Sequence, residues 1–230
     1  MTEHGTTDIG DDLRRLASQR PHLMDHLKNF KQITGEYPIL IEEADSEYES
    51  DQPNVLYPVG GPIYCHVYGD VGQDKKYYAI EPELGDDEQE VYRNIKDRLL
   101  KKSVSKPAPA EQSEYDDRIE ELLEETVTIS EGAAGALDTV RRRIKGQYAV
   151  DEQTFENIRY RLNRDIVGFG PLEPVMRDPA NEDIHVIGPH QCMVDHGVFG
   201  MLETTVDFGT PEEFDNWLRN MGERIGDPLS

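Results

Sequence analysis

The chain has 230 residues, enough for one large domain or two small ones. Acidic residues outnumber basic ones by 47 to 24, and the resulting net charge of -23 argues against direct binding to nucleic acid or to anionic lipid. Two cysteines, Cys65 and Cys192, are too few for a disulfide framework, so we expect a reducing compartment.

The acidic surface favours a halophilic source. At molar salt the screening length falls to about 3 Å, so repulsion between surface carboxylates costs little. Arginine also outnumbers lysine. The alternative interpretation is an ordinary acidic protein. The polar N-terminus lacks the pattern of a secretory signal, and no apolar run approaches the ~18 residues of a membrane span. We therefore expect any membrane contact to run through partners.

The first half of the chain predicts helices followed by strands. Residues 8–34 carry leucines at helical spacing, with a break at Pro21. Residues 55–84 alternate β-branched and aromatic side chains between glycine turns, which indicates two or three strands. Residues 86–103 predict a helix with an acidic first turn and a basic last turn. These elements make up a predicted subdomain over residues 1–105.

A linker rich in proline and small residues is predicted at 106–113, with a second subdomain at 114–230. The predicted helices of this second subdomain span residues 115–132, 133–146 and 151–168, the last capped by Asp151. Strands are expected at 183–187, 191–195 and 201–208. A last helix begins at Thr210 with a capping-box pattern. The expected fold class is α/β (α+β), with small sheets in two subdomains and no phosphate-loop core.

One run in the second half has a specific pattern of glycine, proline and acidic residues. Its residues are Gly168, Gly170, Pro171, Leu172, Glu173, Pro174, Asp178, Pro179, Glu182, Asp183 and Ile184. With the strands and helix that follow, this run resembles the N-terminal region of archaeal secretion ATPases of the type II/type IV family, which includes pilus and archaellum motors. The acidic composition points to a haloarchaeal member. Taken alone, the same residues predict a tight turn and a strand start, and no chemistry.

The resemblance implies a role in a hexameric, cytoplasmic motor at the inner face of the cell membrane. The implied partners are a downstream catalytic domain, neighbouring subunits and a polytopic membrane platform protein, without nucleic acid or direct membrane insertion. ATP and Mg²⁺ are expected in the parent protein and not on this chain alone, because the sequence lacks the G-x-x-x-x-G-K-[ST] loop that holds phosphates. A stand-alone adaptor of such a motor is the alternative.

Arg219 and Arg224 are the candidate phosphate contacts, on the last helix near the expected catalytic cleft. The competing interpretation is a solvated helix face, since arginines are common on the polar side of amphipathic helices. A cluster of potential zinc ligands is the other candidate site: His185, His190, Cys192 and His196. Their spacing fits no structural zinc motif, and alternation along strands sends neighbours to opposite faces. The basic residues Arg141, Arg142, Arg143 and Lys145 suit a helix C-terminus, and the alternative is contact with an acidic partner or a phosphate.

Overall fold

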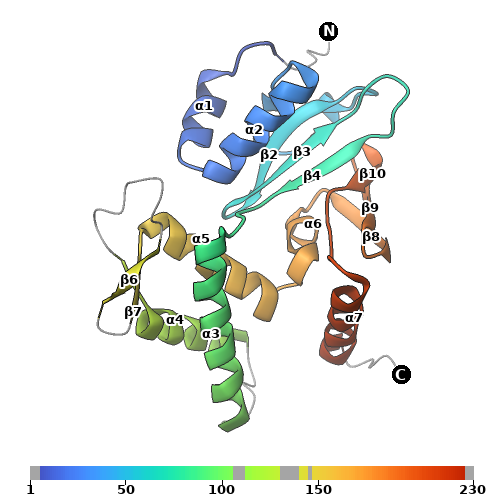
Figure 1. Ribbon diagram of the computed structural model, residues 1–230. Coiled ribbons are helices and arrows are strands. Elements are labelled where there is room, and N and C mark those ends of the chain that lie inside the picture. Colours follow the sequence, from blue (N-terminus) through green and yellow to red (C-terminus); the bar gives the residue numbers. More distant parts are fainter. Residues whose placement is uncertain (1–5, 106–111, 130–139, 145–146, 226–230) are drawn as a thin grey trace. The chain divides into compact units, whose positions relative to one another are not determined.

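The computed structural model of the chain describes residues 6–105, 112–129, 140–144 and 147–225. It mixes helices and strands, as predicted, and divides into two compact units (Figure 1). Unit 1 combines residues Met1–Glu81 with Phe169–Ser230, and unit 2 spans Pro82–Gly168. None of the helices in the described part of the chain combines the length and the apolar character that crossing a bilayer requires.

Unit 1 is built on a seven-stranded mixed sheet of order β1-β2-β3-β4-β10-β9-β8. Its strands come from both ends of the chain: β1 (Ile39–Leu40), β2 (Asn54–Gly60), β3 (Ile63–Tyr68), β4 (Lys76–Ile80), β8 (Asn181–Gly188), β9 (Gln191–His196) and β10 (Gly200–Thr204). The two halves of the sheet join where β10 pairs in parallel with β4, with Glu203 opposite Lys76 and Thr204 opposite Tyr77. One sheet thus unites segments more than 100 positions apart.

Helices pack against both faces of this sheet. On one face lie α1 (Asp11–Ser18) and α2 (Pro21–Thr34), which bury leucines against Leu56, Tyr64 and Ile80 (Figure 1). The other face is covered by η2 (Gly170–Leu172) and α6 (Glu173–Arg177), which pack on a larger apolar cluster. The remaining elements of unit 1 are η1 (Ser46–Tyr48) and α7 (Pro211–Ile225).

The predicted break in the first helical run is confirmed. Pro21 occupies the first turn of α2, where its missing N–H has no helical partner to lose. The helix ends at Gly35, which adopts the left-handed conformation with φ of 82°. The capping box of the last helix also forms: the Thr210 N–H donates to Glu213 Oε2 at 2.8 Å, and the Glu213 N–H donates to Thr210 Oγ1 at 3.3 Å.

Unit 2 packs three helices beside a three-stranded sheet of order β5-β7-β6. The helices are α3 (Asp86–Ser105), α4 (Gln112–Thr126) and α5 (Glu152–Ile166), and the strands are β5 (Val127–Ile129), β6 (Val140–Ile144) and β7 (Gln147–Val150). Asp151 caps α5 as predicted, because its carboxylate accepts the Thr154 N–H at 2.7 Å. The core of unit 2 gathers Val91, Ile95, Ile119, Leu122, Leu123, Ile158 and Leu162.

Two helix predictions in unit 2 were wrong in part. Residues 127–129, expected to continue the helix from 115, form β5, and residues 140–144, expected within a helix at 133–146, form β6. Val127, Thr128 and Ile129 are all β-branched, and β7 offers them a parallel partner that local helical spacing does not reveal. The helix predicted at 133–146 also includes residues 133–139 and 145–146, which lie outside the described residues. Lys145 of the basic cluster is one of them.

The bounds of the two units differ from those of the predicted subdomains, which were 1–105 and 114–230. Because β4 pairs with β10, the N-terminal strands and the C-terminal strands share one unit, and the helices between them form the other. Most of the predicted linker, residues 106–111, lies outside the described residues.

Candidate functional site

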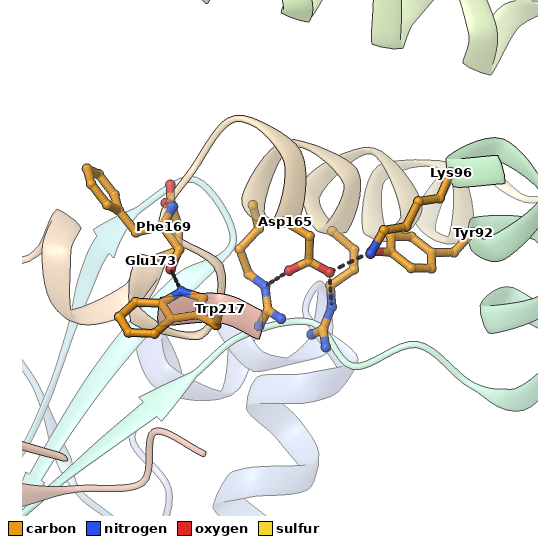
Figure 2. A network of polar contacts seen from close by, with 8 residues as sticks. Tyr92, Lys96, Asp165, Phe169, Glu173 and Trp217 are labelled. Atoms are coloured by element: carbon orange, nitrogen blue, oxygen red, sulfur yellow. Dashed lines mark hydrogen bonds and ion pairs between the residues drawn. The ribbon is translucent and has the colours of Figure 1, made fainter. Parts of the chain in front are cut away.

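The run that carries the resemblance forms a compact corner in unit 1, where η2 and α6 precede β8. Glu173 is buried and holds this corner together. Its Oε2 accepts the Phe169 N–H at 2.8 Å, and its Oε1 accepts from Arg177 Nε. The Phe169 carbonyl in turn accepts the indole N–H of Trp217 at 3.0 Å, as Figure 2 shows. The corner is therefore tied to α7, the last helix.

Gly170 sits at the tightest point of this corner. Its φ is 60°, a left-handed conformation that L side chains rarely adopt. A Cβ placed there would lie 3.2 Å from both Cδ1 and Nε1 of Trp217. Glycine is thus required for two independent reasons, one of conformation and one of space.

We predict that Gly170→Ala destabilises unit 1 by about 2 kcal/mol, combining left-handed strain with displacement of the Trp217 ring. Trp217 is the single tryptophan of the chain, so its fluorescence reports this corner directly in a urea titration. Gly188→Ala is the matched control, because Gly188 has no positive φ and no atom lies within 4 Å of the place that an alanine methyl would take there. Equal stability of the two variants would contradict this role for Gly170.

Asp178, from the same run, is buried directly behind the corner. Its Oδ2 accepts the Tyr57 hydroxyl at 2.7 Å and the Tyr77 hydroxyl at 2.9 Å. Its Oδ1 accepts the Ala180 N–H at 3.0 Å. Tyr57 lies on β2 and Tyr77 on β4, so this carboxylate binds the C-terminal run to two N-terminal strands.

His196 extends this network, and its hydrogen bonds fix its tautomer. The Nδ1 atom accepts the N–H groups of Val198 and Phe199 at 3.1 and 3.3 Å, so the proton lies on Nε2. Nε2 donates to the Tyr57 oxygen at 2.9 Å, and the Tyr57 proton goes on to Asp178. Burial lowers the pKa of His196, which keeps the ring neutral.

These groups are too well covered to meet a substrate. The exposed fractions of Tyr57, Asp178 and His196 are 2%, 3% and 1%. Cys65 beside them is fully buried, and burial raises the pKa of its thiol. The network therefore joins strands and holds no reacting group at the surface.

The two candidate phosphate contacts lie on α7 and are both exposed. Five positions separate Arg219 from Arg224, which corresponds to about 140° around the helix axis. Arg224 lies seven positions after Trp217 and shares its side of the helix, whereas Arg219 faces away and donates to Asn216 at 3.2 Å. The two guanidinium groups therefore lie on different sides of α7.

The candidate zinc ligands are also kept apart. Cys192 and His196 are buried on the core face of β9, while His185 is exposed on β8. His190 is exposed and pairs with Asp207 at 3.0 Å. Among the described residues, no three histidine, cysteine, aspartate or glutamate side chains gather as metal ligands would.

Unit 2 has a polar cluster of its own at the end of α5 (Figure 2). Asp165 accepts from Tyr92 at 2.7 Å and from Arg164 Nε at 2.7 Å, and lies 3.4 Å from Arg161 Nε. Burial by itself would raise the pKa of Asp165, but the two guanidinium groups and the Tyr92 hydroxyl outweigh it and lower the pKa. The cluster ties α5 to α3 through Tyr92.

Sequence reasoning missed two residues of the corner. Glu173 was listed in the motif, but no role was predicted for it. Arg177, which pairs with Glu173, was not among the candidate residues. The i to i+4 spacing of these opposite charges was the available signal.

No family model matches this chain. It is 33% identical over 223 residues to uncharacterized protein MJ0900 of Methanocaldococcus jannaschii, a match that covers 95% of this chain and 40% of the relative. It is 26% identical over 212 residues to uncharacterized protein MJ1288 of the same organism, covering 88% of this chain and 76% of that relative. The chain thus spans about two fifths of the length of MJ0900 and about three quarters of MJ1288, and the similarity extends over both units.

Proposed function

We propose that the chain acts as the N-terminal regulatory and ring-assembly region of a hexameric type II/type IV secretion or pilus-assembly ATPase. The observation that carries the proposal is the run from Gly168 to Ile184, whose residues resemble that family and form the corner and the Asp178 network. In this role the chain would couple ATP hydrolysis elsewhere in the protein to filament assembly or export.

The contacts between distant segments of unit 1 support such a role. A region that transmits motion between a nucleotide site and a ring must move as one body. Asp178 connects β2 and β4 to the C-terminal run, and the β4–β10 pairing makes one sheet of both chain segments. Long-range hydrogen bonds of this kind favour rigid-body rotation over internal bending.

The chemistry in this proposal lies outside the chain. ATP and Mg²⁺ would be held by a catalytic domain of the parent protein, since the 230 residues contain no phosphate-binding loop. Of the two candidate arginines, Arg224 is the better placed contact, because it shares the side of α7 that packs on the corner. Neighbouring subunits and a polytopic membrane protein would be the partners, at the cytoplasmic side of the membrane.

The greater length of MJ0900 supports a catalytic domain separate from the region that this chain represents, because that relative has polypeptide beyond the matched region. The first test is the purified full-length MJ0900 protein, in which we expect ATP hydrolysis and a hexamer by sedimentation. Deletion of the region that matches this chain is expected to abolish the hexamer. Full-length MJ0900 that neither binds nor hydrolyses ATP would overturn the proposal.

A second test uses this chain itself. We expect purified residues 1–230 to show no ATP turnover and no ATP binding by calorimetry at millimolar nucleotide. Tight binding of ATP that Arg224→Ala weakens at least tenfold, and that the exposed control Arg14→Ala leaves unchanged, would place the nucleotide site within this chain and contradict the proposal. A stand-alone adaptor would instead bind a separate ATPase in trans without a catalytic continuation of its own.

A further inference from the structure

In the described part of unit 1, the outward face of β8, β9 and β10 carries exposed side chains. On these strands the even-numbered residues Ile184, Cys192, Val194 and Leu202 pack into the core. Odd-numbered residues such as Met193 and Met201 point to the other face, on which the cluster beneath α1 and α2 takes in residues of β1, β2, β3 and β4. The outward residues are Asp183, His185, Ile187, Met193, Asp195, Met201 and Glu203, hereafter the β8–β10 face.

Apolar side chains cross this face in a diagonal row. The row runs from Met201 on β10 through Met193 on β9 to Ile187 on β8. Each residue lies on the neighbouring strand, about two positions along from the residue directly opposite the previous one. Ile187 is 60% exposed and Met201 is 49% exposed, whereas Met193 is half-buried between them. Three strands at a spacing of about 4.8 Å present a strip about 10 Å wide, close to the diameter of an α-helix.

Acidic side chains border the row. Asp183 and Asp195 stand directly opposite each other across β8 and β9, and Asp195 is also opposite Met201. Like charges in directly opposed positions destabilise a sheet. Neither carboxylate has an ion-pair partner within the described ranges, whereas Glu203 lies 3.6 Å from Lys76 Nζ. The opposed carboxylates leave an unbalanced negative charge on this face.

We propose that the β8–β10 face docks a basic amphipathic helix of a partner protein. Its aliphatic side would cover Met201, Met193 and Ile187, and a lysine or arginine at its edge would lie between Asp183 and Asp195. Methionine side chains are unbranched and adapt to such surfaces. The proposal stands on this face alone and does not depend on the proposed ATPase role.

The negative charge of the β8–β10 face disfavours some binding partners and favours others. Two copies of the face would oppose carboxylate to carboxylate, and an anionic membrane or nucleic acid would meet the same repulsion. A helix with cationic flanks relieves the Asp183–Asp195 repulsion and buries the apolar row at the same time.

The probe is a synthetic peptide of leucine and lysine of about 18 residues, with leucines on one helical face and lysines beside them. We expect it to bind the 230-residue chain with 1:1 stoichiometry in calorimetry at about 0.15 M salt, and to shift NMR amide signals of β8, β9 and β10 but not those of α1 and α2. A peptide with glutamate in place of lysine should not bind.

Matched variants separate this face from the general acidity of the protein. Asp183→Asn with Asp195→Asn, and separately Ile187→Ser with Met201→Ser, should each weaken binding about tenfold or more. The controls are Glu42→Gln with Glu43→Gln, which removes the same charge from an exposed loop, and Val71→Ser, which removes an exposed apolar side chain from a turn. The controls should bind within twofold of the original chain.

The carboxylate variant has a second readout that needs no peptide. Removing two opposed charges should raise the urea midpoint of unit 1, followed by Trp217 fluorescence. The proposal is overturned if the Glu42/Glu43 control loses as much affinity as the Asp183/Asp195 variant, or if the serine variant binds normally. A dimer of the chain that is detected by sedimentation and lost in the Ile187/Met201 serine variant would assign the face to a second copy instead.

Discussion

Acid should destabilise unit 1 progressively below about pH 6.5, because His26 of α2 contacts the fully buried His66 of β3. His26 Nε2 lies 2.9 Å from His66 Nδ1, and His66 Nε2 lies 3.0 Å from Asn54 Oδ1. Asn54 points its amide nitrogen to Glu36 at 3.5 Å, so its oxygen accepts from His66. His66 Nδ1 is then the acceptor for His26, and both rings are neutral.

The sign of the effect follows from the pKa values. Burial lowers the pKa of His26 to about 4, and burial together with His26 lowers the pKa of His66 well below its ordinary 6.5. The unfolded chain therefore binds more protons than the folded chain below pH 6.5, and stability falls as the pH falls. His26 alone accounts for about 3 kcal/mol between pH 6.5 and pH 4. His22, whose pKa burial also lowers, adds in the same direction.

Urea titrations at constant ionic strength, followed by Trp217 fluorescence at several pH values from 7 to 4, measure this loss. His26→Gln retains a donor toward His66 but does not titrate, so its stability should vary less with pH over this range. His185→Gln is the control, since His185 is exposed on β8. A His26→Gln variant with the full pH dependence of the original chain would show that this pair does not set the acid sensitivity.

Loss of the Asp178 carboxylate should be the most damaging single change in unit 1. Asp178→Ala leaves the buried hydroxyls of Tyr57 and Tyr77 and the Ala180 N–H without their acceptor. At about 1–3 kcal/mol for each orphaned group, we expect a total near 4 kcal/mol after partial relaxation. Asp74→Ala, at an exposed loop position, should change stability by less than about 0.5 kcal/mol.

A double-mutant cycle tests whether the loss of stability in Asp178→Ala comes from the two tyrosine hydroxyls. In a chain that carries Tyr57→Phe and Tyr77→Phe, the tyrosine hydroxyls are already gone, so Asp178→Ala should cost about half as much as in the original chain. Urea midpoints with Trp217 fluorescence and with circular dichroism give the four free energies. An undiminished cost in the phenylalanine background would mean that Asp178 acts through something other than the two tyrosines.

Local patterns in the sequence determined much of the secondary structure. Pro21, Asp151 and the Thr210–Glu213 capping box act within one helical turn, so their effect is readable from neighbouring residues. Along β8, Ile184 packs inward and Asp183 is exposed, as alternation along a strand predicts.

Tertiary structure alone decided which segments pair. Nothing near Lys76 shows that β4 lies beside β10, and nothing near Val127 shows that β7 gives it a partner. Strand pairing depends on a surface supplied from a distant part of the chain, so the bounds of the two units and the strands β5 and β6 were not predicted. For the same reason Asp178 looked like a turn residue until the fold placed Tyr57 and Tyr77 against it.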